Sequence, residues 1–220
     1  MSSFLNSSIG KKLIMSLSGL FLIMFLLVHL TINLTLFFGA EVYNAACYFM
    51  GNNIVMRIIE PILAIGFIIH ILYSVILYFQ NLKARPIKYK LVNQKESSSW
   101  SSRNMLFLGL AVLSFLGVHL VNYFYKIKFT DLIESGEMTE YSLVTGLFTI
   151  EYWYFVAIYV VGVIALGLHL NHAFQSALQT IGLNNEYWEK RWKVLGSLYA
   201  LLIAVGFSII PLYFLITEFI

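Results

Sequence analysis

Five apolar stretches, each long enough to cross a membrane as a helix, dominate this sequence of 220 residues. They run approximately over 13–38, 58–80, 104–125, 152–178 and 194–217. About 20 helical residues span a hydrocarbon core of about 30 Å. Only 11% of the residues are charged, so the chain cannot cover a water-facing surface. We expect an all-α fold with one domain over 1–220: an integral membrane bundle of five transmembrane helices, with no cleavable leader.

Lysine and arginine are divided unevenly between the two ends of these helices. One end carries only Arg57, Lys126 and Lys128. The other end, which includes the N-terminus, carries Lys11, Lys12, Lys83, Arg85, Lys88, Lys90, Lys95, Arg103, Lys190, Arg191 and Lys193. Because positive residues accumulate on the cytoplasmic side of membrane proteins, we expect a cytoplasmic N-terminus and an external C-terminus.

All five histidines lie inside the predicted spans, and the first four spans each hold at least one: His29, His70, His119, and His169 with His172. Ionisable residues inside a membrane are costly and commonly functional. For any single histidine, the alternative to a functional role is that its side chain only forms a hydrogen bond between two helices. A set spread over four helices favours a shared function.

The depths of the histidines form two levels. A rise of about 1.5 Å per residue places His29 roughly 25 Å and His119 roughly 22 Å from the cytoplasmic ends of their helices. His70 and His169 each lie roughly 15 Å from theirs. Two imidazoles from facing helices can ligate a haem iron from its two sides. The sequence therefore predicts two haem b groups, with His29 and His119 as iron ligands of one, and His70 and His169 as ligands of the other.

Short motifs around these histidines resemble those of the diheme cytochrome b membrane anchors of succinate dehydrogenases and fumarate reductases, in the five-helix single-anchor form of Bacteroidetes. The similarity covers nearly the whole chain and rests on the order and spacing of five motifs: Leu27-Val-His29-Leu-Thr-Ile-Asn33, Gly39-Ala-Glu41-Val-Tyr-Asn44, Phe67-Ile-Ile-His70, Gly117-Val-His119-Leu and Leu168-His169-Leu-Asn-His172-Ala-Phe-Gln-Ser176.

The resemblance implies a function in the cytoplasmic membrane of a bacterium. Such a chain anchors a flavoprotein subunit and an iron–sulfur subunit on the cytoplasmic face. It carries electrons from them through two haems to menaquinone near the outer face, as the membrane subunit of a succinate:menaquinone oxidoreductase. The single cysteine, Cys47, and the lack of a dinucleotide-binding motif mean that this chain cannot oxidise succinate alone.

Other polar residues are candidates for the quinone and for the haem propionates. Glu60, Glu41 and Asn33 are candidates for contact with the quinone, because its redox chemistry needs proton donors or acceptors beside the ring. The candidates for propionate binding are His172, Arg103, Lys193, Lys11 and Lys12. His172 could also replace His169 as a ligand. The alternative for the lysines and Arg103 is that they only anchor the helices at the cytoplasmic face, as positive residues commonly do.

Three alternatives remain open. A quinol:fumarate reductase anchor would be built alike. Some fumarate reductase members carry a glutamate two residues before the histidine ligand of the fourth helix, and this glutamate is linked to proton movement across the membrane. This chain has Gly167 at that position. We therefore do not expect such a proton route here, which favours succinate oxidation. Another two-haem membrane reductase would place two ligands on each of two helices. A haem-free transporter could use the histidines as a proton relay, and it would be colourless.

Overall fold

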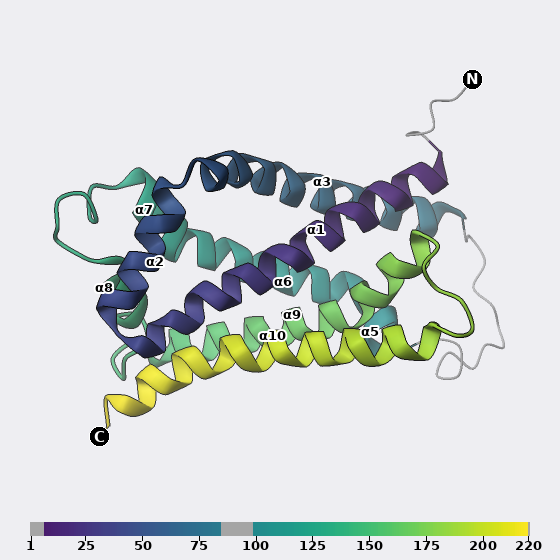
Figure 1. Ribbon diagram of the computed structural model, residues 1–220. Helices are drawn as coiled ribbons and strands as arrows, with labels where there is room; N and C mark the ends of the chain where they lie inside the picture. The colour runs from purple at the N-terminus through teal and green to yellow at the C-terminus, as the bar shows by residue number, and fades with distance from the viewer. Residues whose placement is uncertain (1–6, 85–98, 220) are drawn as a thin grey trace.

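The computed structural model describes residues 7–84 and 99–219, and the regular elements within them are all helices. Five helical segments there are long and apolar enough to span a membrane, which confirms the expected fold class. They are α1 (Ser8–Leu34) with η2 (Thr35–Phe38), α3 (Ile54–Ala84), α6 (Met105–His119) with η3 (Leu120–Tyr125) and α7 (Lys126–Phe129), α9 (Trp153–Thr180), and α10 (Glu189–Thr217). The five segments run along one another from end to end of the bundle (Figure 1).

Several helices extend beyond the spans predicted from hydropathy. Helix α1 begins at Ser8, where the hydroxyl of Ser7 accepts a hydrogen bond from the backbone N–H of Gly10 at 3.0 Å. Helix α3 continues to Ala84, and α10 starts at Glu189. A helix does not end where the hydrocarbon ends, because lysine and arginine side chains can lie along the apolar surface and place their charge in the polar layer.

The connections contain three short helices that were not predicted: α2 (Ala40–Asn52), α5 (Trp100–Arg103) and α8 (Glu140–Thr145). The stretch 126–151, which we expected to be a loop, begins with α7, the end of the third span, and also holds α8. The expected loop 81–103 begins with the last turn of α3 and ends with α5; its central part, 85–98, lies outside the described residues.

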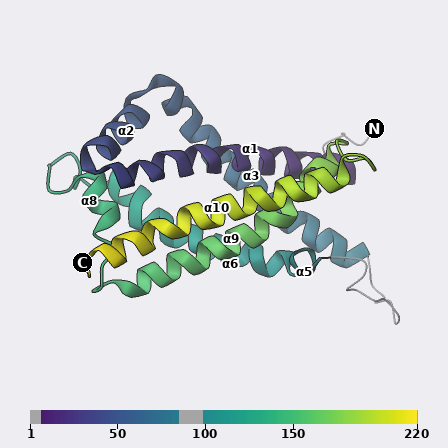
Figure 2. The same cartoon turned by 60° about the horizontal axis from the view of Figure 1, so that its bottom comes forward.

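Helices α2 and α8 meet at one end of the bundle, which we call the α2/α8 end (Figures 1 and 2). The side chain of Asn44 on α2 accepts a hydrogen bond from the backbone N–H of Tyr141 on α8 at 2.9 Å. On the same helix, burial raises the pKa of the Cys47 thiol to about 11 and also raises the pKa of Tyr43, which contacts it. Both groups therefore stay protonated at neutral pH.

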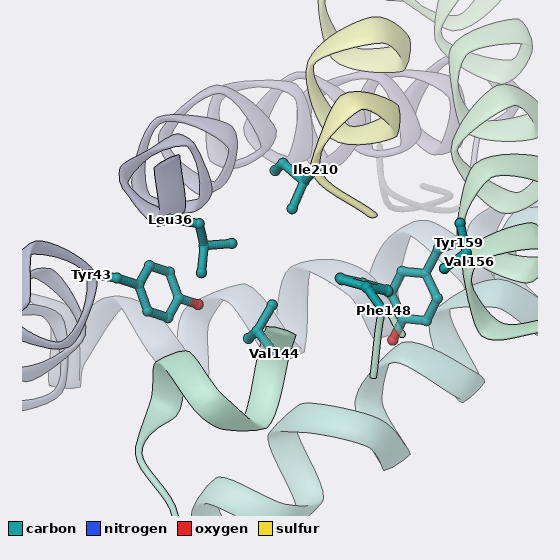
Figure 3. Packing of buried hydrophobic residues seen from close by; sticks show 7 residues of the cluster. All are labelled: Leu36, Tyr43, Val144, Phe148, Val156, Tyr159 and Ile210. Atoms are coloured by element: carbon teal, nitrogen blue, oxygen red, sulfur yellow. The ribbon is translucent and has the colours of Figure 1, made fainter. Parts of the chain in front are cut away.

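Helix α1 is central to the packing, because it contacts α3, α9 and α10, while α9 also packs against α10 and α6. A cluster of seven buried residues closes the α2/α8 end: Leu36, Tyr43, Val144, Phe148, Val156, Tyr159 and Ile210 (Figure 3). A second cluster lies between α1, α9 and α10 and consists of Ile23, Leu30, Leu170, Ala200 and Ile203.

Close contact between α9 and α10 depends on a glycine. A Cβ atom added at Gly167 would lie 2.8 Å from the Cβ of Ala204 and 3.4 Å from the carbonyl oxygen of Ala200. Small residues at such points allow two helix backbones to approach in a membrane, where dispersion forces rather than the exclusion of water hold helices together. The absence of a side chain at this position is thus a packing requirement of the fold.

We expect Gly167→Ala to destabilise the bundle by about 1–3 kcal/mol, because the added methyl group forces α9 and α10 apart. Thermal unfolding of the purified chain in detergent, followed by circular dichroism, measures this as a lower Tm. The matched control is Gly51→Ala, since an added Cβ there meets no atom within 4 Å. Equal melting temperatures for the two variants would contradict the packing argument.

Candidate functional site: two facing pairs of histidines

Four of the five histidines face each other in two pairs. The ring centroids of His29 on α1 and His119 at the end of α6 are 5.7 Å apart, with an interplanar angle of 89°. The centroids of His70 on α3 and His169 on α9 are 6.5 Å apart, at 70°. Each pair joins two helices that are not among the closely packed helix pairs of the described residues. The imidazoles, rather than the helix backbones, meet there.

This spacing fits two ligands of one metal ion. Imidazoles bound to opposite sides of an ion have ring centroids roughly 6 Å apart, because each metal–nitrogen bond is about 2 Å long. Two neutral imidazoles in an apolar bundle are also the donor set that a low-spin haem iron takes. Within the described residues no group of three or more His, Cys, Asp and Glu side chains gathers as a cluster for a bare metal ion. The donor set is therefore two separate pairs.

His70 is held by α1 rather than by its own helix. Its Nδ1 lies 3.4 Å from the hydroxyl of Ser18, and the imidazole is also near the backbone of Met15. Its ring also packs on Gly19, where an added Cβ would come within 3.3 Å of Cε1. The residues Met15, Ser18 and Gly19 thus form a cradle for this imidazole on α1.

The cradle favours one tautomer of His70. The hydroxyl of Ser18 donates to the carbonyl oxygen of Met15 at 2.9 Å. With its proton used there, Ser18 can only accept from His70. This favours a neutral ring with its proton on Nδ1 and a free lone pair on Nε2. This is the arrangement that metal-binding histidines have when the second nitrogen is hydrogen-bonded.

His29 has a different environment. Its ring is stacked on Phe25 at 5.2 Å and lies 5.5 Å from the ring of Phe207 on α10. The amide nitrogen of Asn33 donates to the backbone carbonyl of His29 at 2.8 Å and lies 3.4 Å from its Nδ1. A donor at Nδ1 leaves the ring proton on Nε2, so metal binding by Nε2 requires the Asn33 amide to turn its oxygen toward Nδ1.

His169 has an unused nitrogen. Its Nδ1 is buried and makes no hydrogen bond to any described residue. A buried polar atom without a partner is costly and calls for an explanation. His172, one turn further along α9, is half-buried, and the ring that faces His70 is that of His169. The geometry therefore favours His169 over His172 as the partner of His70.

His119 lies among aromatic side chains that the sequence did not single out. The rings of Tyr123 and Tyr159 are 5.3 Å and 6.1 Å from it. The amide of Asn122, which is buried with 9% of its surface exposed, donates to the hydroxyl of Tyr159 at 3.2 Å. An asparagine inside an apolar span was the signal that could have identified this group.

The predicted quinone candidates are spread over the α2/α8 end. Glu60 forms an ion pair with Lys128 at 2.9 Å, and both side chains are about two-fifths exposed, at 43% and 41%. Glu41 is exposed in the first turn of α2. Asn33 is the one candidate of the three that contacts a histidine of the two pairs.

Apart from His172 within α9, the predicted propionate-binding residues lie at the opposite end of the bundle. Arg103 is the last residue of α5 and is exposed. Lys193 is exposed near the start of α10, where it forms an ion pair with Glu189 on its own helix at 2.7 Å. Lys11 and Lys12 are in the first turns of α1. The structure places these residues at the same end of the bundle.

Comparisons with known protein families, with curated proteins and with solved structures found no match for this chain.

The His70 cradle can be tested by removing its hydroxyl group. We expect Ser18→Ala to weaken the preference for the Nδ1–H tautomer of His70 by about 1 kcal/mol, the net value of one hydrogen bond. The Met15 carbonyl keeps the same sign of preference. The side-chain ¹⁵N shifts of labelled histidine in the haem-free chain report the tautomer ratio. In the matched control Ser114→Ala, the serine bonds only its own helix, at Leu110. Identical shifts in both variants would show that Ser18 does not hold the ring.

Proposed function

We propose that this chain is a two-haem cytochrome b subunit that carries electrons across a membrane. The observation that carries the proposal is the two histidine pairs, His29 with His119 and His70 with His169. In each pair the imidazole rings face each other at a spacing suited to two ligands of one iron. The five apolar helices support a membrane location. Bound haem supplies reversible one-electron transfer at each level of the bundle.

The two levels are arranged for transfer along the bundle. Ser18 contacts His70, and His29 lies eleven residues further along the same helix, so the two pairs are separated by roughly 16 Å along α1. The residues of the chain set the position and the electronics of each level. The cradle on α1 orients the ring of His70, which faces the ring of His169, and aromatic rings surround His29 and His119 at the other level.

The wider function that we propose is that of the membrane anchor of a succinate:menaquinone oxidoreductase. The motifs around the histidines support it, as does the excess of basic residues at the end that carries α5 and the start of α10. We place that end on the cytoplasmic side, with the N-terminus inside and the C-terminus outside. A flavoprotein subunit and an iron–sulfur subunit would dock there, and menaquinone would react at the α2/α8 end.

The packing of Gly167 bears on the direction of the reaction. A glutamate at this position would have to place its side chain where the Cβ of Ala204 and the carbonyl of Ala200 already lie. A transmembrane proton route through this position therefore has no room in this fold. This supports succinate oxidation over the quinol:fumarate reductase alternative.

The haem content of the purified chain tests the central proposal. We expect wild type to show a reduced b-type spectrum and two haems per chain. His29→Ala and His119→Ala should each remove or disturb the same haem, and His70→Ala and His169→Ala the other, because each substitution removes one of the two side chains that would hold that haem. Reduced-minus-oxidised spectra and redox titration of each variant measure this.

The contrary outcomes are equally clear. A wild-type chain without haem would overturn the proposal and favour the proton-relay transporter. Loss of one haem in His172→Ala, together with its retention in His169→Ala, would reassign the ligand on α9. If His29→Ala and His70→Ala disturbed the same haem, the proposed assignment of ligands to the two haems would be wrong.

A further inference from the structure

The helix that carries His119 changes its geometry directly after this residue. Residues Leu120–Tyr125 form a π-helical turn between α6 and α7. A π-helical turn holds more residues than an α-helical turn, so the side chains beyond it are rotated around the helix axis, and such turns are frequent at functional sites. Here the turn keeps Tyr123 against His119 and directs Asn122 toward Tyr159 on α9.

Asn122 is also part of the wall of a pocket. The pocket has a volume of about 350 Å³ and lies between η3, α8 and the start of α9. Its polar lining comes from Asn122, Lys126, Ser142 and Tyr152, and its apolar lining includes Leu143 and Phe155. A largely apolar pocket with a few polar groups that fix orientation is the usual form of a small-molecule site.

The pocket is connected to the His29–His119 pair through one layer of side chains. Asn122 faces the pocket on one side and donates to the hydroxyl of Tyr159 on the other. The rings of Tyr159 and Tyr123 are in contact at 5.9 Å, and both lie beside His119. The hydroxyl of Tyr123 is buried next to Tyr159. A ligand in this pocket would therefore be separated from the histidine pair only by this polar and aromatic layer.

We propose that this pocket binds the ring of a membrane quinone, with the side-chain amide of Asn122 hydrogen-bonded to one ring oxygen. The proposal rests on the proposed electron-transfer function and locates its exchange site. The apolar lining suits the ring and its tail, while Asn122, Ser142 and Lys126 can bond carbonyl or hydroxyl oxygens. The pocket contains none of the earlier candidates Glu41, Glu60 and Asn33.

The reaction in this pocket is balanced as follows. Reduction of the ring adds two electrons and two protons, and both carbonyl groups become hydroxyl groups. The electrons arrive one at a time from the level of His29 and His119. The protons come from water at the pocket mouth, where Tyr152 is exposed and Lys126 is half-buried. Asn122 forms hydrogen bonds in both states, because its amide can donate to a carbonyl oxygen and accept from a hydroxyl group.

Direct binding of a short quinone tests the pocket without relying on haem. The probe is 2-methyl-1,4-naphthoquinone, titrated into the full chain in detergent while the quenching of tyrosine and tryptophan fluorescence is followed. We expect Asn122→Leu to raise the Kd roughly tenfold, since a hydrogen bond to the ring is lost. The matched control is Asn52→Leu, because Asn52 is exposed on α2 at the same end and bonds Tyr48 and Arg57, neither of which lines the pocket. Its Kd should stay that of wild type.

A second variant keeps the test valid if Asn122→Leu fails to fold. Met138→Trp adds bulk to the pocket from a loop residue that lines it, and it should weaken binding as well. Wild-type Kd values in a folded Asn122→Leu or in Met138→Trp would overturn the proposal. Haem content is measured on the same samples. If the chain binds two haems but its quinone binding does not depend on Asn122, the pocket proposal fails and the cytochrome proposal stands. If the chain has no haem but its quinone binding depends on Asn122, the cytochrome proposal fails and the pocket proposal stands.

Discussion

The structure depends on how imidazole rings are accommodated within apolar helices. Lipid offers no hydrogen-bond partner, so each ring must be satisfied by another part of the protein or by a bound group. His70 meets this requirement with Met15 and Ser18 on α1, while His169 keeps a buried nitrogen without a hydrogen bond among the described residues. The two members of this pair are therefore unequal: one is already oriented, and the other has an unused donor atom or lone pair.

The accommodation of the rings also explains why helix packing is uneven. Helices α9 and α10 are in close contact because Gly167 allows it, whereas α3 has no fully buried residue along its length. Helix α3 packs mainly against α1, and its His70 faces His169 on α9. The span without a fully buried residue is thus one that carries a member of a histidine pair.

The sequence predicted the long helices and the levels of the histidines well, because both depend on regular local geometry. Hydropathy reports a span directly, and a constant rise per residue places His29 at the height of His119. It did not predict α2 and α8, since short helices depend on tertiary contacts such as that between Asn44 and Tyr141. The π-helical turn and the link from Asn122 to Tyr159 were also missed, because they depend on which side chains α9 presents to α6.

The pairing of helices has a consequence for the order in which the chain matures. During synthesis α1 and α3 leave the ribosome first, so His70 can settle on its cradle before either of the later partner helices exists. The couple of His29 and His119 is complete once α6 has been inserted, whereas the couple of His70 and His169 must wait for α9. The two couples would then be completed in sequence, and a nascent chain arrested between α6 and α9 would hold both histidines of the first couple and one histidine of the second.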